Sequence, residues 1–234
     1  RMHLYPDGGA YHLRQALARK LQMQPDQLLI GAGSNEIIEL LGHAFLNQTV
    51  NIVMADRAFA VYKLVAMAAR AETIMAPMRD YTHDLDAMLA AITPATRLVF
   101  ISNPNNPTGT MVDGRALDRF LQRVPEHVIT VLDEAYVELL PPARQPDVLP
   151  HVRAGRNMVI LRTFSKTYGL AGLRVGYALG HRELIEALHR VKDSFNSYPL
   201  DRFAVAGAAA AMEDRAYFEE TCAKVVATRT RLVT

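Results

Sequence analysis

The sequence predicts an α/β protein built around a mostly parallel sheet of seven strands. Seven short segments rich in Val, Ile and Leu recur along the 234 residues, and they do not alternate apolar with polar side chains. Continuous apolar runs of this length are typical of strands that are buried on both faces of a sheet. Longer segments with helical periodicity lie between these runs, which indicates βαβ units with parallel strands.

The expected strands and helices alternate along most of the chain. The apolar runs predict strands at residues 28–31, 50–54, 72–75, 97–102, 128–132, 158–162 and 175–179. The periodic segments predict helices at residues 13–21, 35–46, 59–69, 85–92, 114–123 and 183–191. Two further helices, at residues 201–212 and 215–232, follow the last strand.

Composition and charge argue against several classes of protein. Hydrophobic residues make up 50% of the chain and charged residues 21%, as in ordinary globular proteins. The formal net charge is +2 without any long run of like charges, which argues against nucleic acid or an anionic membrane as the main partner. The longest apolar run, residues 203–212, is too short to span a bilayer.

Cysteine and histidine usage adds two expectations. The single cysteine, Cys222, argues against an internal disulfide, and the eight histidines show no metal-ligand spacing, so we predict no metal site. No charged segment followed by an apolar segment opens the chain in the manner of a signal peptide. A cytoplasmic location is therefore the default expectation.

Loops that directly follow the predicted strands are the places to look for a site, because ligands of open α/β sheets bind beyond the carboxyl ends of the strands. After residues 28–31, Gly33 permits close backbone approach, and free N–H groups at the start of the next helix could bind an anion. The alternative there is an ordinary helix cap by Ser34 or Asn35. After residues 97–102, two prolines stiffen an Asn-rich loop at residues 103–109, for which a common turn is the alternative.

Two later loops carry ionisable groups. Asp133 directly follows the segment 128–132 and enters apolar surroundings, where a carboxylate needs a cation, a donor or a metal. Tyr136, three residues on, could offer a hydroxyl to the same ligand. After residues 158–162, Lys166 lies in a Gly/Ala-rich loop that could desolvate its amine and make it nucleophilic. Arg174, eight residues later, suits an anionic group, although a lone lysine is more often a solvated surface charge.

Taken together and in this order, the motifs resemble the cofactor signature of the fold-type I pyridoxal-phosphate enzymes, specifically the class I/II aminotransferases. The motifs are Asn-Pro-Asn-Asn-Pro-Thr-Gly at residues 103–109, Asp-Glu-Ala-Tyr at 133–136, and Ser-Lys at 165–166 with Arg174. The segments at residues 5–8, 33–36, 59–62 and 197–200 are similar to the histidinol-phosphate aminotransferase branch. The resemblance covers nearly the whole chain and implies a three-layer α/β/α large domain.

The resemblance also implies a cofactor and roles for the residues around it. Lys166 would bond covalently to pyridoxal 5'-phosphate and later act as the general base. Asp133 would pair with the protonated ring nitrogen, and Asn106 and Tyr136 would hydrogen-bond the 3' oxygen of the ring. Phe59 would stack on the face of the ring, with a core aromatic as the alternative.

The phosphate of the cofactor would be held by the remaining matching residues. Ser34 and Asn35 would contribute backbone N–H groups, and Thr163, Ser165 and Arg174 would add hydroxyl and guanidinium contacts. The implied reaction is the transfer of an amino group from histidinol phosphate to 2-oxoglutarate, a step of histidine biosynthesis. The partners would be a small amino donor and a 2-oxo acid.

The positions of the motifs suggest how the chain is organised. Residues 1–24 would form an N-terminal arm and helix, residues 25–213 the cofactor-binding domain, and residues 214–234 the start of a helix leading to a small domain that is missing from this chain. Tyr5 is similar to the family tyrosine that reaches the neighbouring subunit's site, which implies a homodimer. The arginine that holds the substrate carboxylate in the family has no match here.

Several alternatives stay open on the sequence. Relatives with the same cofactor loops transaminate aromatic amino acids or decarboxylate threonine phosphate. A non-catalytic, cofactor-sensing regulatory domain is a further possibility, against which no basic helix-turn-helix precedes Tyr5. A plain nucleotide-binding α/β protein is disfavoured because the chain has no Gly-rich phosphate fingerprint.

Overall fold

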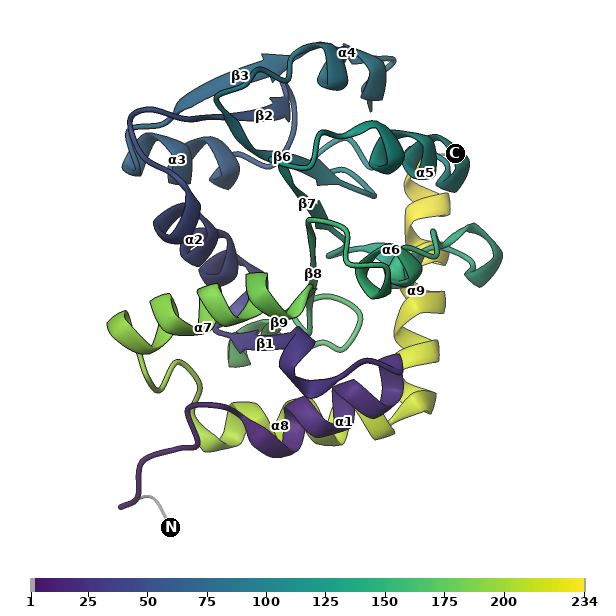
Figure 1. Cartoon of the computed structure of the whole chain (residues 1–234). Coiled ribbons are helices and arrows are strands. Elements are labelled where there is room, and N and C mark those ends of the chain that lie inside the picture. Colours follow the sequence, from purple (N-terminus) through teal and green to yellow (C-terminus); the bar gives the residue numbers. More distant parts are fainter. Residues whose placement is uncertain (1–2, 234) are drawn as a thin grey trace.

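Within residues 3–233, which the computed structural model describes, seven strands form one sheet with helices on both faces (Figure 1). In spatial order, the strands are β1 (Leu28–Gly31), β9 (Gly176–Gly180), β8 (Met158–Thr163), β7 (Ile129–Asp133), β6 (Thr96–Ser102), β2 (Asn51–Ala55) and β3 (Glu72–Ala76). The strands β8, β7, β6, β2 and β3 pair in parallel. Among the strands of this sheet in the described chain, β9 alone runs the other way, because it pairs antiparallel with both β1 and β8. The prediction of a mostly parallel seven-stranded sheet is confirmed.

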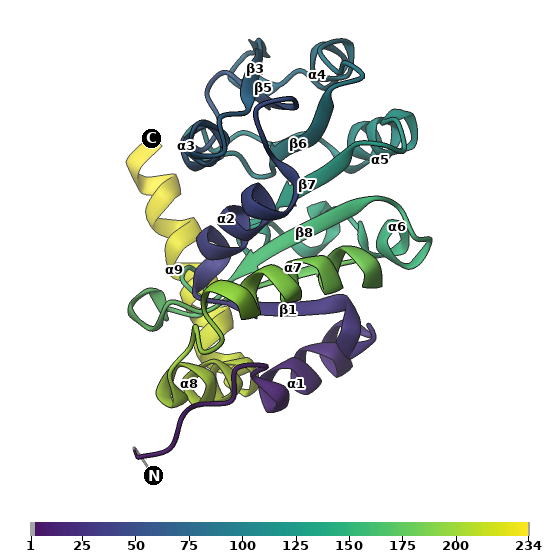
Figure 2. The same cartoon turned by 60° about the vertical axis from the view of Figure 1, so that its left-hand side comes forward.

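The helices form two layers, as the family resemblance implied. One face of the sheet packs against α2 (Gly33–Phe45), α3 (Val61–Ala68) and α7 (Arg182–Phe195). The other face packs against α1 (Tyr11–Leu21), α4 (Leu85–Ala90), α5 (Gly114–Arg123), α6 (Leu149–Arg153) and α8 (Arg202–Glu213). Figures 1 and 2 show α2 and α3 on one side of the strands and α5 and α6 on the other. The long helix α9 (Arg215–Val233) runs along the outside of the molecule and buries none of its described residues.

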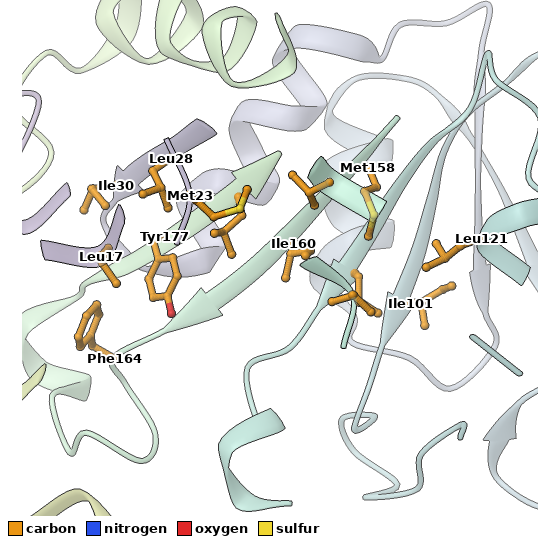
Figure 3. Packing of buried hydrophobic residues seen from close by; sticks show 14 of the residues in the cluster. Leu17, Met23, Leu28, Ile30, Ile101, Leu121, Met158, Ile160, Phe164 and Tyr177 are labelled. Atoms are coloured by element: carbon orange, nitrogen blue, oxygen red, sulfur yellow. The ribbon is translucent and has the colours of Figure 1, made fainter. Parts of the chain in front are cut away.

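Successive strand residues are buried in opposite layers, which explains why the strands carry continuous apolar runs. In β6, Phe100 faces the α2 layer, whereas Ile101 faces the α5 layer, and neither residue is exposed to solvent. Figure 3 shows part of the buried cluster on the α5 face of the sheet, to which Leu17 of α1, Ile160 of β8 and Tyr177 of β9 belong. Burial of a large apolar side chain stabilises a fold by about 1.5–3 kcal/mol.

The predicted elements are all present, and their ends move by a few residues. The sequence analysis missed the shortest elements, because two to five residues show no measurable periodicity. They are the hairpin of β4 (Met78–Arg79) and β5 (Thr82–His83), the helix α6, and the 3₁₀ turns η1 (Pro25–Gln27), η2 (Val137–Leu139), η3 (Pro142–Arg144) and η4 (Ala171–Leu173). No helix in the described part of the chain combines the length and the apolar character needed to cross a membrane.

A buried group of charged side chains lies at the end of β7 and β8, on the face that packs against α1. Glu134 is almost fully buried. Its Oε2 accepts a hydrogen bond from Arg162 Nε at 2.8 Å and forms an ion pair with Arg162 Nη2 at 2.8 Å. The positive charges of Arg162 and Lys20 lie near Glu138, in η2, and each lowers the pKa of its carboxyl. Burial outweighs these charges and raises the pKa of the Glu138 carboxyl to about 7.

The replacement Glu138→Gln is expected to flatten the pH dependence of stability. A carboxyl whose pKa is raised on folding contributes stability that is present below its unfolded pKa and is lost as the pH rises through the folded value. For Glu138 that window runs from its ordinary value of 4.5 to about 7. Relative to the unchanged chain, Glu138→Gln should therefore gain about 2 kcal/mol of unfolding free energy between pH 5 and pH 8.

Urea unfolding of both chains at pH 5, 6, 7 and 8 measures this difference. Glu126, an exposed glutamate, supplies the matched control Glu126→Gln, which should leave the pH dependence unchanged. A constant difference between the Glu138→Gln chain and the unchanged chain across this range would show that Glu138 titrates normally.

Candidate active site

One cavity of about 240 Å³ is lined by all the residues that the sequence predicts to bind a cofactor, except Tyr5. The predicted residues in its lining are Ser34, Asn35, Phe59, Asn106, Asp133, Tyr136, Thr163, Ser165, Lys166 and Arg174. Ser102, Ala135 and Ala171 complete the lining. The structure thus brings together residues that lie up to 140 positions apart in the chain.

The strand directions explain this convergence. Ser102, Asp133 and Thr163 are the last residues of the parallel strands β6, β7 and β8, so they lie at one edge of the sheet. Arg174 reaches the same edge because the antiparallel strand β9 begins there, two residues after it. The start of α2, which follows β1, adds Ser34 and Asn35 to the residues at this edge.

One end of the cavity is acidic and buried. Asp133 is 5% exposed; its Oδ2 accepts a hydrogen bond from Tyr62 Oη at 2.8 Å, and its Oδ1 accepts one from the backbone N–H of Ala135 at 3.1 Å. Burial raises the pKa of Asp133, while Tyr62, Ala135 and the positive charge of Lys166 oppose that rise. A carboxylate held in this way is matched to a cationic or N–H-bearing ligand atom.

Tyr62 is a residue of the site that the sequence analysis missed. It is fully buried, its ring is stacked on Phe100 with centroids 4.5 Å apart, and it meets Phe59 edge-on at 5.6 Å. Tyr62 follows Phe59 by three residues, and this spacing is the sequence signal that would have placed both rings on one side of the helix expected at residues 59–69.

The other end of the cavity is suited to an anion. Arg174 Nη1 lies 3.1 Å from the carbonyl oxygen of Ala171, to which it donates, and 3.5 Å from Ser165 Oγ. The backbone N–H of Ser165 donates to Thr163 Oγ1 at 3.1 Å, which fixes the loop that follows β8. These groups place a guanidinium and hydroxyls around the same space.

The first turn of α2 completes this end. The residue before the helix is Ala32, which has no capping side chain, and its own N–H donates to Glu36 Oε2 at 2.6 Å. The alternative in which Ser34 or Asn35 caps the helix is therefore wrong, since both lie inside the first turn. The N–H groups of a first turn have no partner within the helix, and the helix dipole favours an anion there.

Lys166 also lines the cavity, and its Nζ lies 5.2 Å from the centre of the Tyr136 ring. The sequence analysis expected its own loop to desolvate this lysine, but the side chain is exposed in the described chain. The small residues of the loop, such as Gly169 and Gly172, have too little side chain to cover it. The expectation of burial by this loop is therefore wrong.

In the asparagine-rich loop after β6, two asparagines hydrogen-bond to the backbone and a third lines the cavity. Asn103 is buried and exchanges hydrogen bonds with the backbone of Val112, at 3.0 Å and 3.3 Å. Asn105 is also buried and donates to the carbonyl oxygen of Arg57 at 3.0 Å. These contacts stiffen the loop and leave Asn106 as its asparagine in the cavity lining.

Tyr5 lies away from the cavity, on the surface of the chain. It is 80% exposed, its ring stacks on Tyr198 with centroids 5.0 Å apart, and its carbonyl oxygen accepts a hydrogen bond from Arg202 at 2.9 Å. Lys192, which is buried, donates to the carbonyl oxygen of Gly8 at 3.3 Å. The N-terminal arm is therefore fixed to the segment between α7 and α8.

The replacement Gly176→Ala is expected to damage the anion-binding end. A Cβ at Gly176 would lie 2.4 Å from the backbone nitrogen of Ser34, so β9 and α2 would have to separate. Such overpacking typically costs about 1–3 kcal/mol of unfolding free energy. Urea unfolding measures this loss, and Gly172→Ala is the matched control because a Cβ there meets no atom within 4 Å. Equal stability of the two variants would contradict the close approach.

The comparison with protein families agrees with this fold and arrangement. The chain belongs to the class I and II aminotransferases, whose family model matches residues 1–234. It is 49% identical over 218 residues to a histidinol-phosphate aminotransferase of Moorella thermoacetica, a match covering 93% of this chain and 56% of that protein. It is 44% identical over 231 residues to histidinol-phosphate aminotransferase 2 of Nitrosospira multiformis, covering 99% of this chain and 58% of that protein.

A solved structure provides the corresponding match in three dimensions. The crystal structure of histidinol-phosphate aminotransferase from Sinorhizobium meliloti, in complex with pyridoxal-5'-phosphate, has a TM-score of 0.91 and 31% sequence identity to this chain. The match covers 98% of this chain and 61% of that one. The chain thus spans a little over half the length of the relatives that it matches.

Proposed function

We propose that the protein is a pyridoxal-phosphate-dependent aminotransferase acting on histidinol phosphate and 2-oxoglutarate. The observation that carries the proposal is that one cavity lining combines the buried carboxylate of Asp133, the anion-binding groups around Arg174 and the amine-bearing Lys166. The two relatives and the solved structure described above carry the name histidinol-phosphate aminotransferase, which supports the choice of substrate.

The residues of the cavity fit this cofactor. Pyridoxal phosphate has a basic ring nitrogen, a phosphate and an aldehyde, and the cavity offers a carboxylate, an anion-binding end and an amine. The chemistry of this donor set suits a small planar cofactor better than a nucleotide, since the chain has no Gly-rich phosphate loop and the volume is only about 240 Å³.

When bound, pyridoxal phosphate supplies an electron sink for a carbanion at the substrate Cα. The residues of this chain would hold it and move protons around it. The carboxylate of Asp133 would accept a hydrogen bond from the protonated ring nitrogen. Asn106 and the Tyr136 hydroxyl would bind the 3' oxygen, and Phe59 would cover one face of the ring.

Lys166 would serve as the covalent anchor and as the general base. Its flexible stem lets one amine reach two neighbouring carbon atoms, and its free amine can take up and return a proton. The phosphate would be held by backbone N–H groups of Ser34 and Asn35, by the hydroxyls of Thr163 and Ser165, and by the guanidinium of Arg174.

The choice of amino donor is tested by a half-reaction panel. The purified protein is loaded with pyridoxal phosphate and mixed with one amino donor at a time, and conversion of the cofactor to pyridoxamine phosphate is measured by chromatography. Conversion by histidinol phosphate, and not by phenylalanine or tyrosine, is expected. Preferred conversion by an aromatic amino acid, or release of carbon dioxide from threonine phosphate, would assign a different substrate class. A failure of every donor would favour the sensor alternative.

We further propose that the protein works as a homodimer in which Tyr5 reaches the neighbouring site. The support is the exposure of Tyr5 together with the exposed aromatic residues Tyr198 and Phe203 near the arm. Sedimentation of the purified protein is expected to give twice the chain mass of 26.0 kDa. A monomer that transaminates at full rate would contradict this role of Tyr5.

For the cellular compartment, we propose the cytoplasm. The chain has one cysteine, and Cys222 is a free thiol, which is usual for proteins of reducing compartments. Fractionation of the source cells would contradict this proposal if the protein were recovered from an oxidising or extracellular fraction.

A further inference from the structure

We infer that Tyr62 is a positioning residue that orients two groups toward the cofactor, the carboxylate of Asp133 at the ring edge and the Phe59 ring at the ring face. The inference rests on the proposed function, because it concerns how the same cavity receives pyridoxal phosphate. The geometry that supports it is a single buried side chain in contact with both groups.

The first contact fixes the carboxylate. Tyr62 Oη donates to Asp133 Oδ2 at 2.8 Å, and the backbone N–H of Ala135 donates to Oδ1 at 3.1 Å. Each oxygen of an ionised carboxylate can accept a second hydrogen bond. Both oxygens are therefore anchored from the protein side, while Asp133 still lines the cavity and can accept a ring N–H.

The same contact favours the ionised form of Asp133. Burial raises the pKa of this carboxyl and so disfavours its ionised form, whereas the hydrogen bond from the Tyr62 hydroxyl lowers the pKa. Tyr62 itself remains a neutral donor, because burial and the neighbouring carboxylate raise its pKa well above the ordinary value. A protonated Asp133 could not stabilise a positive charge on the ring nitrogen.

The second contact fixes the aromatic wall. Tyr62 is held in place by stacking on Phe100, with ring planes 11° apart, and it presents its ring to Phe59 at 85°. Phe59 lines the cavity from two residues before the start of α3, and the edge-on contact with Tyr62 supports its orientation. Tyr62 therefore orients both protein groups that the cofactor ring would contact, Asp133 at its edge and Phe59 at its face.

The test removes only the hydroxyl. The replacement Tyr62→Phe keeps both ring contacts, so it isolates the hydrogen bond to Asp133. The dissociation constant of pyridoxal phosphate, measured by equilibrium dialysis at pH 8, is expected to rise about tenfold, in line with the loss of a charge-assisted hydrogen bond. The loss should grow as the pH is lowered to 6, because Asp133 without its donor binds a proton more readily.

A double-mutant comparison separates positioning from a general structural effect. In an Asp133→Asn background, which has no negative charge to stabilise, Tyr62→Phe is expected to change the dissociation constant by less than twofold. Tyr177→Phe is the matched control, since Tyr177 is a buried tyrosine of the opposite face of the sheet, and it should leave cofactor affinity within twofold of the unchanged protein.

The outcomes distinguish this inference from the proposed function. An unchanged protein that binds no pyridoxal phosphate would refute the proposed function itself. An unchanged protein that binds it normally, together with a Tyr62→Phe variant of equal affinity and pH dependence, would refute the role of Tyr62 alone. An equal loss in the Asp133→Asn background would also refute it. Should Tyr62→Phe fail to fold, Tyr62→His takes its place, because the shorter imidazole ring cannot reach Asp133. A folded Tyr62→His variant that binds the cofactor as tightly as the unchanged protein would overturn the inference.

Discussion

Replacement of Lys166 by alanine is expected to abolish covalent attachment of pyridoxal phosphate and to reduce transamination by at least about 10⁴-fold. The proposed function gives this residue two tasks, because its amine is both the attachment point and the base that moves the proton. No other lysine lies in the lining of the cavity, as far as residues 3–233 define it. A neighbouring side chain therefore cannot take over either task.

The covalent link gives a readout that does not depend on turnover. The loaded protein is reduced with borohydride, denatured and digested, and the peptide that contains Lys166 is expected to carry the added mass of the cofactor. The Lys166→Ala chain should carry none. Because Lys166 is exposed, the unfolding free energy of the Lys166→Ala chain should stay within about 0.5 kcal/mol of that of the unchanged protein.

Lys63 supplies the matched control, since it is an exposed lysine on α3 outside the cavity. Lys63→Ala should retain both the fixed cofactor and the activity. Cofactor that remains fixed to the Lys166→Ala chain after reduction would show that another amine forms the link.

Asp133→Asn is expected to retain cofactor binding but to lose turnover by about 10³-fold. The amide keeps the size and the hydrogen-bonding shape of the carboxyl group, but it has no negative charge to stabilise a protonated ring nitrogen. Removal of one electrostatic contact to a developing charge typically reduces turnover by about 10²–10³-fold, and the carboxylate of Asp133 is buried.

The same replacement is expected to stabilise the cofactor-free protein at neutral pH. Burial raises the pKa of Asp133, so ionisation of this carboxyl on the alkaline side of its ordinary value costs folding stability. The amide has no such cost, and its unfolding midpoint at pH 7 should lie above that of the unchanged chain. Thermal unfolding and steady-state kinetics of the two proteins measure the two effects.

Asp80→Asn is a suitable control, because Asp80 is an exposed carboxylate outside the cavity lining. It should alter neither turnover nor cofactor affinity. Unchanged turnover of Asp133→Asn would contradict the role of this carboxylate at the ring nitrogen, whatever its effect on stability.

Much of the fold could be predicted because its signals are local. The strands such as β7 (Ile129–Asp133) are short runs of apolar residues, and the helices between them show their own periodicity. The site loops could be located for a similar reason, since each directly follows an apolar strand and carries Gly, Pro, Asn or an ionisable residue. The two-residue strands β4 and β5 were not predicted, because two residues are too few to show a strand pattern.

Part of the site could not be predicted because it depends on contacts between distant segments. Tyr62 and Asp133 are separated by 71 positions, and the sequence gives no sign that their side chains meet. The exposure of Lys166 is of the same kind, because the apolar character of its loop says nothing about which neighbours cover it. The ion pair of Glu134 with Arg162 joins the ends of two strands across 28 positions.

The sequence by itself determined the order of the elements, the loops that carry the chemistry and the residue types within them. Only the tertiary structure decided that β9 runs antiparallel, and this direction brings Arg174 to the same edge as Asp133 and Lys166. Only the tertiary structure placed Tyr62 between Asp133 and Phe59. The physical reason is that periodicity and turn propensity act over a few residues, whereas strand pairing and side-chain packing are decided by the whole core.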